Sequence, residues 1–579
     1  MKYLLENLKQ YKKESILAPL FKMLEAFFDL FVPIVVADII NIGIGNQDRQ
    51  YIMQRCGILV LLALIGITCS FTAQFFAARA SVGCAAGLRH MLFSHIQTLG
   101  YSEIDTMGTS TLITRMTSDI NQVQNGVNMF LRLFLRSPFI VLGAMIMAFT
   151  INAKIALVFL IAIPVLSVII FGIMRITSPL YKMVQGRLDC VLGITRENLT
   201  GVRVVRAFGK ERAEVERFEA ANGRLNDMQL HVGHISGLMN PLTYVVVNLG
   251  IIAILNMGAS HIHNGILLSG DVIALVNYMS QILVELVKLA NTVVLLSKAL
   301  ASLNRVKGVL ETEPSMKFIR KEGISSAGEG NAGEAVAFEH VSLTYAGAGE
   351  ESLTDISFCA QRGQTIGVIG GTGSGKSSLV SLIPRFYDAT KGQVRIMGKP
   401  IREWDREELR TTVGVVMQKA QLFAGTIRSN LLWGNQDADD EQLWKALELA
   451  QAAEFVRSKP LGLDEPVEQG GRNFSGGQKQ RLTIARALVR QPKILILDDS
   501  ASALDFATDA ALRKALGTLP EDITVFIVSQ RASSLKHADQ ILVLDDGETA
   551  DKGTHEELLK RCDVYREIYE SQFKKGEAY

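Results

Sequence analysis

Gly370 to Ser377 have the residue types and the spacing of a loop that binds phosphate. Their sequence, GGTGSGKS, fits the pattern G-x-x-x-x-G-K-[ST] and stands between a strand-like run and a helix-like run. In such a loop backbone amides surround phosphate oxygens, Lys376 reaches the terminal phosphates and Ser377 can bind magnesium. A plain glycine turn is the alternative, which the flanking runs disfavour. The residues predicted to contact phosphate are Gly370, Thr372, Gly373, Ser374, Gly375, Lys376, Ser377 and Ser378.

A pair of carboxylates ends a second strand-like run. The stretch ILILDDSASALD, from Ile494 to Asp505, begins with aliphatic residues typical of a buried strand and stops at Asp498 and Asp499. Beside a phosphate loop, a strand that ends in aspartate holds the magnesium ion of a nucleoside triphosphate, so Asp498 is predicted as a metal ligand with Ser377. A solvated turn or a helix cap is the alternative. The magnesium role leaves Asp499 unexplained.

A third group of residues forms a candidate second anion site. In NFSGGQKQRLTIARALV, Ser475, Gly476 and Gly477 precede an amphipathic, helix-like run. A hydroxyl, two unhindered amides and a helix N-terminus can together bind an anion. One nucleotide cannot need both this site and the phosphate loop from a single domain.

SGGQ followed by KQRLTIARAL resembles the signature of the ATP-binding cassette (ABC) transporters. Further matches are Tyr345, similar to the aromatic residue that stacks on adenine, Gln418, similar to the glutamine of the family's glutamine loop, and Ser502 to Asp505, similar to its dimer-contacting loop. The resemblance implies ATP and Mg²⁺ as cofactors, Gln418 as a catalytic, nucleotide-binding and metal-binding residue, and contact of Ser475, Gly476, Gly477 and Gln478 with nucleotide. In this family two cassettes stack head to tail, and each ATP lies between the phosphate loop of one and the signature of the other.

The chain departs from the family pattern at two catalytic positions. Asp499 stands where a glutamate usually polarises the attacking water, and Gln530 stands where a histidine usually contacts the terminal phosphate. A general base is worth about 10²- to 10⁴-fold in rate, and a glutamine cannot carry the charge of a histidine. Because the signature is intact, we predict an asymmetric heterodimer whose partner supplies the missing groups and borrows Ser475 to Gln478. A homodimer with two slow sites, or one in which aspartate suffices, is the alternative.

The residues that carry this chemistry are predicted to lie in an α/β domain that spans 336–579. Its short β-rich runs, TIGVIG, TVGVVM, ILILDD, TVFIVS and ILVLDD, alternate with helical stretches, which indicates a largely parallel sheet. A charged, Gly- and Ser-containing stretch at 311–335 is expected to be a linker.

The first part of the chain, 1–310, is predicted to be a membrane domain of six spanning helices. Lysine and arginine gather in the N-terminal tail and in the two long connectors, 83–126 and 177–235, which places these connectors, both termini and the C-terminal domain on the cytoplasmic side. The connectors are rich in helix formers, so the spanning helices are expected to extend into the cytosol and to turn near 101–108 and 208–211. The apolar segments are 16–44, 56–82, 127–151, 155–176, 236–259 and 270–297.

Composition restricts the possible partners and the compartment. The 48% hydrophobic share is high for a soluble protein, and a net charge of +2 without a basic, aromatic-interleaved tract argues against a nucleic-acid partner. Six scattered cysteines without a CxxC pair are expected to be reduced thiols, and no cleaved signal peptide is expected. These features suit a bacterial inner membrane.

Charges inside the predicted spans are candidates for substrate contact. Acidic and basic residues in apolar segments are often functional, and here they would suit a cavity for cationic amphiphiles; a place in the solvated helix extensions is the alternative. His261 and His263 in a short outer loop lack further metal ligands. The charged residues are Glu25, Asp29, Asp38, Arg132, Arg136, Glu285 and Lys288.

The fused spans and cassette look like an exporter half-transporter. We therefore expect ATP-driven export of hydrophobic or amphipathic, multidrug-like compounds. Export of lipids or unprocessed peptides is an alternative substrate class, and an ATP-gated regulatory or channel-like membrane protein is an alternative function.

Overall fold

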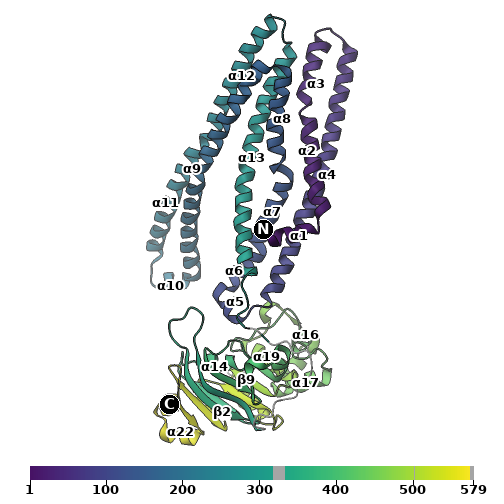
Figure 1. Ribbon diagram of the computed structural model, residues 1–579. Helices are drawn as coiled ribbons and strands as arrows, with labels where there is room; N and C mark the ends of the chain where they lie inside the picture. Colours follow the sequence, from purple (N-terminus) through teal and green to yellow (C-terminus); the bar gives the residue numbers. More distant parts are fainter. Residues whose placement is uncertain (317, 319–332, 501, 574–579) are drawn as a thin grey trace. The chain divides into compact units, whose positions relative to one another are not determined.

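The computed structural model describes residues 1–316, 318, 333–500 and 502–573, which form two compact units (Figure 1). Unit 1 comprises Met1–Gln97 and Ser110–Thr312, and unit 2 comprises Thr98–Thr109 and Glu313–Tyr579. The short segment Thr98–Thr109 therefore groups with the C-terminal part of the chain, although helices of unit 1 flank it in the sequence. Most of the expected linker, 319–332, lies outside the described residues.

Unit 1 is built of long helices. Six helical stretches of the described chain are long and apolar enough to cross a membrane: Lys12–Ile44, Arg49–Ile96, Thr109–Ile151, Ala153–Thr200, Glu211–His263 and Ser269–Leu310. Each predicted apolar segment lies within one of them, so the predicted spans are confirmed. The elements are α1 (Lys2–Lys9), α2 (Lys12–Asp29), α3 (Val32–Asp38), η1 (Ile39–Ile44), α4 (Arg49–Ile96), α6 (Thr109–Thr114), η2 (Arg115–Asp119), α7 (Ile120–Met129), η3 (Phe130–Phe134), α8 (Arg136–Ile151), α9 (Ala153–Thr200), α10 (Val202–Ala207), α11 (Glu211–Gly237), α12 (Met239–His263) and α13 (Ser269–Leu310).

The two longest helices begin at side-chain caps and run far beyond one bilayer crossing. Asp48 accepts hydrogen bonds from two backbone amides at the start of α4, and Asn152 does the same at the start of α9. Each helix then continues for 48 residues, against about 20 needed to span a bilayer. The connectors turn where expected, with a short helix, α5 (Tyr101–Met107), in the first and a turn between α10 and α11 in the second.

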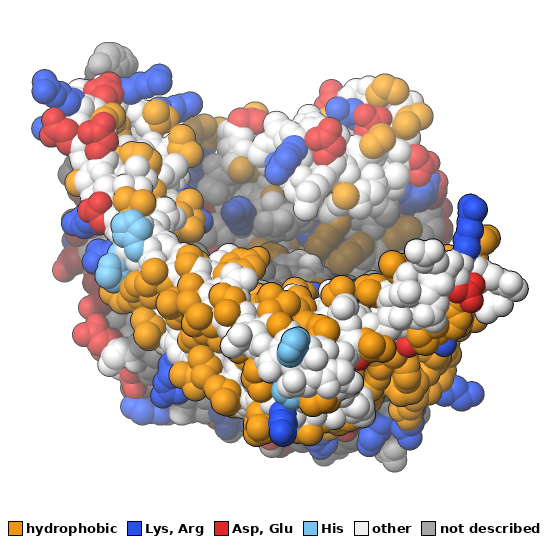
Figure 2. Space-filling model, turned by 90° about the horizontal axis from the view of Figure 1, so that it is seen from above, with side chains coloured by type: hydrophobic (Ala, Val, Ile, Leu, Met, Phe, Trp, Pro, Cys, Tyr) orange, Lys and Arg blue, Asp and Glu red, His pale blue; other side chains and the backbone are white. Residues whose placement is uncertain are grey.

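Helix packing in unit 1 buries a long apolar core. The helix α2 packs on α4, while α9 packs on α8, α11, α12 and α13 (Figure 1). Phe159, Tyr278 and Ile282 are among the fully buried core side chains. Many other large apolar side chains remain exposed, and Figure 2 shows hydrophobic side chains over much of the visible face. An apolar exterior of this extent is typical of a surface covered by lipid.

The described residues of unit 2 form three sheets and short helices. The six-stranded sheet has the order β12-β11-β3-β10-β9-β6, the four-stranded sheet has the order β2-β1-β4-β5, and β7 pairs with β8. The strands are β1 (Glu334–Leu343), β2 (Leu353–Gln361), β3 (Thr365–Gly370), β4 (Lys391–Ile396), β5 (Lys399–Pro400), β6 (Val413–Val416), β7 (Gly425–Thr426), β8 (Pro466–Val467), β9 (Ile494–Asp498), β10 (Thr524–Val528), β11 (Gln540–Asp545) and β12 (Glu548–Gly553). The helices are α5, α14 (Lys376–Leu382), η4 (Ile401–Glu403), α15 (Arg406–Thr412), α16 (Ile427–Leu431), α17 (Asp440–Leu449), α18 (Ala453–Arg457), η5 (Gly462–Asp464), η6 (Gln469–Gly471), α19 (Gly476–Val489), α20 (Phe506–Leu516), α21 (Ala532–Leu535), α22 (His555–Arg561) and α23 (Asp563–Phe573).

The six-stranded sheet is parallel except at one edge. The strands β11, β3, β10, β9 and β6 pair in parallel, and β12 is antiparallel to β11. The predicted parallel sheet is thus confirmed. Parallel strands end at the same edge of a sheet, so the residues that follow β3, β9, β10 and β11 meet there.

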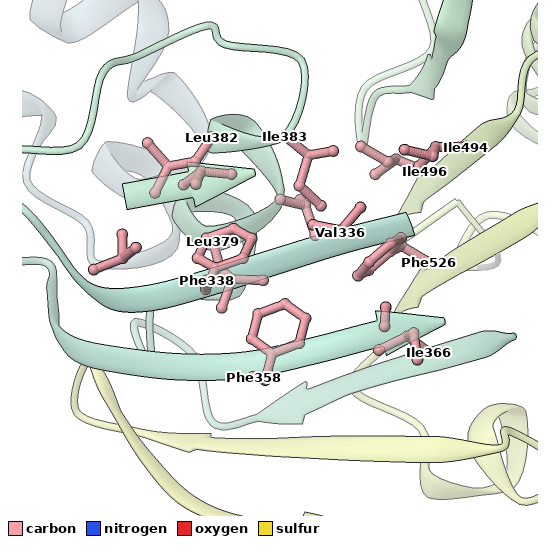
Figure 3. Close-up of a cluster of buried hydrophobic side chains, with 14 of the residues drawn as sticks. Val336, Phe338, Phe358, Ile366, Leu379, Leu382, Ile383, Ile494, Ile496 and Phe526 are labelled. Atoms are coloured by element: carbon pink, nitrogen blue, oxygen red, sulfur yellow. The ribbon is translucent and has the colours of Figure 1, made fainter. Parts of the chain in front are cut away.

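A hydrophobic core joins the two larger sheets of unit 2. Phe338 and Phe358 stack with ring centroids 4.7 Å apart, and Phe526 lies edge-on to Phe358 (Figure 3). Leu379, from the helix after the phosphate loop, is fully buried in the same cluster. This packing anchors α14, and with it the phosphate loop, to the sheet.

Candidate functional site

Backbone conformation makes the glycines of the phosphate loop necessary. A Cβ on Gly370 would lie 2.2 Å from the carbonyl oxygen of Leu544. Gly375 has a φ of +89°, and its Cβ would lie 2.8 Å from the carbonyl oxygen of Ser352. Only glycine fits both positions without a shift of neighbouring backbone. The loop can therefore present its amides to a bound anion.

Lys376 is folded back onto its own loop. Its Nζ donates to the carbonyl oxygens of Gly370 at 2.9 Å and Gly371 at 2.5 Å, and lies 3.3 Å from the Oγ of Ser374. Burial lowers the pKa of this amine, while the charges of Asp499 and Asp498 oppose that shift. The two carboxylates favour the charged form of the amine, and a charged lysine amine is a suitable partner for phosphate oxygens.

Ser377 and Asp498 form the predicted pair of oxygen ligands. The Oγ of Ser377 donates to Oδ1 of Asp498 at 3.0 Å, although the two residues are 121 positions apart in the sequence. Burial raises the pKa of Asp498, and the charge of Asp499 adds to the shift, while the bond from Ser377 and the charge of Lys376 oppose it. A buried carboxylate beside a hydroxyl fits a hard divalent cation such as Mg²⁺, which prefers oxygen ligands.

Asp499 lies beside this pair and is held by Gln418 and by the last residue of β10. Its Oδ2 accepts a hydrogen bond from Nε2 of Gln418 at 3.2 Å, and its backbone amide donates to the carbonyl oxygen of Val528 at 3.0 Å. Its φ is +43°, a conformation in which aspartate is among the better tolerated residues. Gln530, which follows β10, is exposed at the same edge of the sheet.

These residues line one cavity of about 740 Å³. The cavity has room for a nucleotide, since ligand pockets typically measure roughly 300–1,000 Å³. Asp498, Asp499, Gln418 and Gln530 line it together with the phosphate loop. The predicted residues in its lining are Thr372, Gly373, Gly375, Lys376, Ser377, Ser378, Gln418, Asp498, Asp499 and Gln530.

Tyr345 stands next to the cavity rather than in its described lining. Its hydroxyl donates to the Oγ of Ser378 at 2.9 Å, and Ser378 does line the cavity. The ring packs edge-on against Tyr387, with centroids 5.0 Å apart. The ring is thus fixed close to one side of the cavity.

The signature residues occupy a different surface of unit 2. Ser475 and Gln478 form a reciprocal cap at the start of α19: the Ser475 Oγ accepts from the Gln478 amide at 3.3 Å, and the Gln478 Oε1 accepts from the Ser475 amide at 3.0 Å. Ser475 and Gly476 are exposed. None of the residues 475–478 belongs to the described lining of the 740 Å³ cavity. The preceding Phe474 is buried in a core cluster.

The cavity also has lining residues that the sequence reasoning missed. They are Ala348 to Ser352, Val528, Ser529, Asp546 and Gly547. Asp546 and Gly547 follow β11, a parallel neighbour of β3, so the shared edge of a parallel sheet was a signal for them. The loop 348–352 closely follows Tyr345 and carried no comparable motif.

The charged residues of the predicted spans form a network between α2, α8 and α13. Arg136 donates to Oε1 of Glu285 at 2.7 Å and to Oδ2 of Asp29 at 3.0 Å. Glu285 also accepts from Lys288 at 2.9 Å, and Lys22, which the sequence analysis did not single out, pairs with Glu25 at 2.6 Å. These carboxylates are therefore engaged by cations of the chain itself, which weakens the case for a cavity that accepts cationic amphiphiles.

The remaining candidate residues of unit 1 have local partners. Asp38 pairs with Arg55 at 3.3 Å, and Arg132 donates to Asn128 at 3.4 Å. A ring nitrogen of His261 lies 2.8 Å from the carbonyl oxygen of Met257. Among the described residues, no group of three or more His, Cys, Asp or Glu side chains is arranged to hold a metal ion.

Both parts of the chain match known protein families. Residues 15–286 match the family described as ABC transporter transmembrane region, and residues 353–502 match the family described as ABC transporter. Together the matches reach all six apolar helices, the last of them only as far as residue 286, and they include the phosphate loop.

Relatives match over nearly the full length. The Uncharacterized ABC transporter ATP-binding protein YfiB of Bacillus subtilis is 37% identical over 574 residues, which cover 99% of each chain. The ATP-dependent lipid A-core flippase of Vibrio vulnificus is 28% identical over 98% of this chain and 97% of its own. The solved structure of a bacterial Atm1-family ABC exporter with ATP bound has a TM-score of 0.78 at 23% identity, covering 98% of this chain and 99% of that one.

Proposed function

Because the chain belongs to the ABC transporters, we propose that it is one subunit of an ATP-driven exporter whose own ATP site hydrolyses slowly. The phosphate loop binds the phosphates of ATP, and Tyr345 stacks on the adenine. Ser377, Asp498 and Gln418 are the metal ligands, and Mg²⁺ bound there would neutralise charge on the phosphates. Asp499 and Gln530 occupy the positions nearest to the reacting water.

The proposal that two cassettes share each ATP site rests on one observation. The phosphate loop, Asp498 and Asp499 line a single cavity, whereas Ser475 to Gln478 lie outside its described lining and are partly exposed at the start of α19. A hydroxyl and free amides at an exposed helix start suit an anion brought by another molecule. A second cassette therefore supplies the signature for this cavity and receives the signature of this chain.

The chemistry of the cavity supports a weakened site. The carboxylate of Asp499 accepts a hydrogen bond from Gln418. Because aspartate is one methylene shorter than glutamate, this carboxylate reaches less far into the cavity than a glutamate would from the same backbone position. Gln530 can hydrogen-bond, but it cannot carry the positive charge of a histidine. We infer a heterodimer whose partner has the glutamate and the histidine; a homodimer with two slow sites is the alternative.

The substrate is inferred as hydrophobic or amphipathic. A lipid A-core flippase is among the relatives, so a lipid is the first alternative to a drug-like compound. We infer a bacterial inner membrane from the composition of the chain. The positive charges of the tail and of the long connectors favour an orientation with both termini and the cassette in the cytoplasm.

The ATPase activity of the purified chain in lipid vesicles tests the weakened site. We expect a low magnesium-dependent turnover that Asp499→Asn changes little, while Lys376→Ala abolishes nucleotide binding. Brisk turnover that is abolished by Asp499→Asn would show that aspartate suffices and would refute the proposal. Co-expression with a candidate partner tests the pairing, because turnover must then depend on Ser475 of this chain.

A further inference from the structure

The segment Thr98–Thr109 is seated on the cassette by an aromatic contact. It belongs to unit 2, while the chain on either side continues into α4 and α6. The ring of Tyr101 lies 4.6 Å from that of Phe386 and 6.1 Å from that of Tyr387, between centroids. At the start of α5, Glu103 accepts from the amide of Gly100 at 2.7 Å and from the amide of Ser315 at 3.3 Å.

Tyr387 adds a polar contact to the same segment. Its hydroxyl donates to Oδ2 of Asp105, on α5, at 2.5 Å. Burial, and next the bond to Asp105, raise the pKa of this phenol, so it remains protonated and able to donate at physiological pH. A hydrogen bond to an ionised acceptor is stronger than one between neutral groups.

The other side of Tyr387 faces the adenine position. Its ring meets that of Tyr345 edge-on, with centroids 5.0 Å apart and planes at 88°. The hydroxyl of Tyr345 is in turn bonded to Ser378 of α14, beside the phosphate loop. An unbroken series of contacts therefore leads from the nucleotide cavity through Tyr345 and Tyr387 to Asp105.

The loop that carries Tyr387 is held in a strained conformation. Arg385 has a φ of +53°, which is costly for a residue with a long side chain. Its guanidinium makes a two-point contact with Asp388, at 2.8 and 3.1 Å, and lies 4.6 Å from the centre of the Phe318 ring. These contacts fix the backbone so that Phe386 and Tyr387 meet the segment Thr98–Thr109.

We propose that Tyr387 is a positioning residue that transmits occupancy of the adenine position at Tyr345 to the seating of α5. The inference rests on the proposed function, because it takes Tyr345 as the residue that carries adenine. An adenine ring stacked on Tyr345 restricts its motion. Tyr387 packs against Tyr345 edge-on, so its hydroxyl is then held more firmly against Asp105.

Hydrogen exchange of the full chain in lipid nanodiscs tests this inference. The measured quantity is the exchange rate of amides in 98–109 without nucleotide, divided by the rate with Mg²⁺ and the non-hydrolysable analogue AMP-PNP. A net hydrogen bond is worth about 0.5–1.5 kcal/mol, so we expect a ratio of about 2- to 13-fold in the unmodified chain. Tyr387→Phe keeps the ring, removes the donor, and should reduce the ratio to about one.

Two matched variants separate transmission from simple loosening of α5. Asp105→Asn keeps an oxygen that accepts from Tyr387 and should retain most of the ratio, whereas Asp105→Ala should behave like Tyr387→Phe. Affinity for a fluorescent ATP analogue should stay within about twofold of the unmodified chain in all three, since none of them touches the phosphates. A purely structural role would instead speed exchange equally with and without nucleotide.

The outcomes distinguish this inference from the proposed function. An unchanged ratio in Tyr387→Phe, or a ratio of one in the unmodified chain with AMP-PNP bound, would overturn the inference and leave the proposed function standing. If the unmodified chain binds no AMP-PNP at all, both the proposed function and the inference fall.

Discussion

Lengthening Asp499 by one methylene should restore hydrolysis to this chain. In Asp499→Glu the carboxylate can reach about 1.5 Å further from the same backbone position. The backbone itself should hold its place, because the amide of Asp499 is bonded to Val528 and its carbonyl accepts from Ser502. The new carboxylate would lie in the cavity whose lining Asp499 shares with Gln418.

The expected gain follows from the geometry of a general base. A displacement of about 1 Å in a catalytic group costs about a hundredfold in rate, which equals about 2.7 kcal/mol of activation free energy. Gln530 still lacks the charge of a histidine, so we expect about a tenfold increase in kcat for Asp499→Glu alone. The double variant with Gln530→His should approach the full hundredfold.

Magnesium-dependent ATP turnover at saturating ATP is the appropriate assay. Two copies of the chain in densely loaded vesicles can offer Ser475 to Gln478 to each other, so an active site can form without the natural partner. The gain should be in kcat with KM unchanged, because the base acts only in the transition state. If neither variant gains turnover while both still bind ATP, the assignment of Asp499 as the weakened base is wrong.

Three further substitutions test other parts of the molecule. Arg136→Met should lower the free energy of unfolding of unit 1 by about 3 kcal/mol, because it leaves the buried Glu285 and its neighbours without their central cation. Asp498→Asn should raise the melting temperature of the nucleotide-free cassette at pH 7 and abolish stabilisation by Mg²⁺ and ATP. Ser475→Arg should stop hydrolysis in the partner's site of a heterodimer while ATP still binds to this chain.

The direction expected for Asp498→Asn follows from its raised pKa. A carboxyl whose pKa is higher in the folded protein favours folding at a pH below its ordinary value, and this contribution is lost as the pH rises through the raised pKa. At pH 7 the ionised group therefore costs stability, and asparagine removes that cost. A lower melting temperature would contradict this reasoning.

Controls accompany the other two substitutions. Combining Arg136→Met with Glu285→Gln should recover part of the lost stability, as measured by thermal unfolding in detergent; no recovery would mean that the network does not act as a unit. Ser475→Ala should reduce the partner's turnover less than Ser475→Arg, and equal turnover in all three proteins would exclude a shared site.

The nucleotide-site geometry was largely predictable from local sequence. The phosphate loop and Asp498 each follow a strand-like aliphatic run, and parallel strands end at one edge, so Ser377 and Asp498 were expected to meet. The six spans followed from hydrophobic length alone. By contrast, the order of the strands, with β10 between β3 and β9, depends on non-local pairing that no local motif encodes.

Contacts between distant helices were beyond sequence reasoning. Arg136, Asp29 and Glu285 were recognised as separate charges, yet their pairing spans up to 149 positions and depends on how each helix is rotated in the bundle. The same holds for Tyr387 and Asp105, which are 282 positions apart. Folding back of Lys376 onto Gly370 and Gly371 was missed because its expected partners were phosphate oxygens.

The reciprocal cap at Ser475 bears on how such a subunit changes over evolutionary time. Replacing a helix cap costs about 1 kcal/mol, so a substitution of Ser475 would weaken the folding of this chain as well as any role in a neighbouring site. Gln530 is exposed and Asp499 is half-buried in the lining of the cavity, and neither residue caps a described helix. A duplicated subunit can thus drift to slow hydrolysis under relaxed selection, while purifying selection on α19 preserves what it offers to its neighbour.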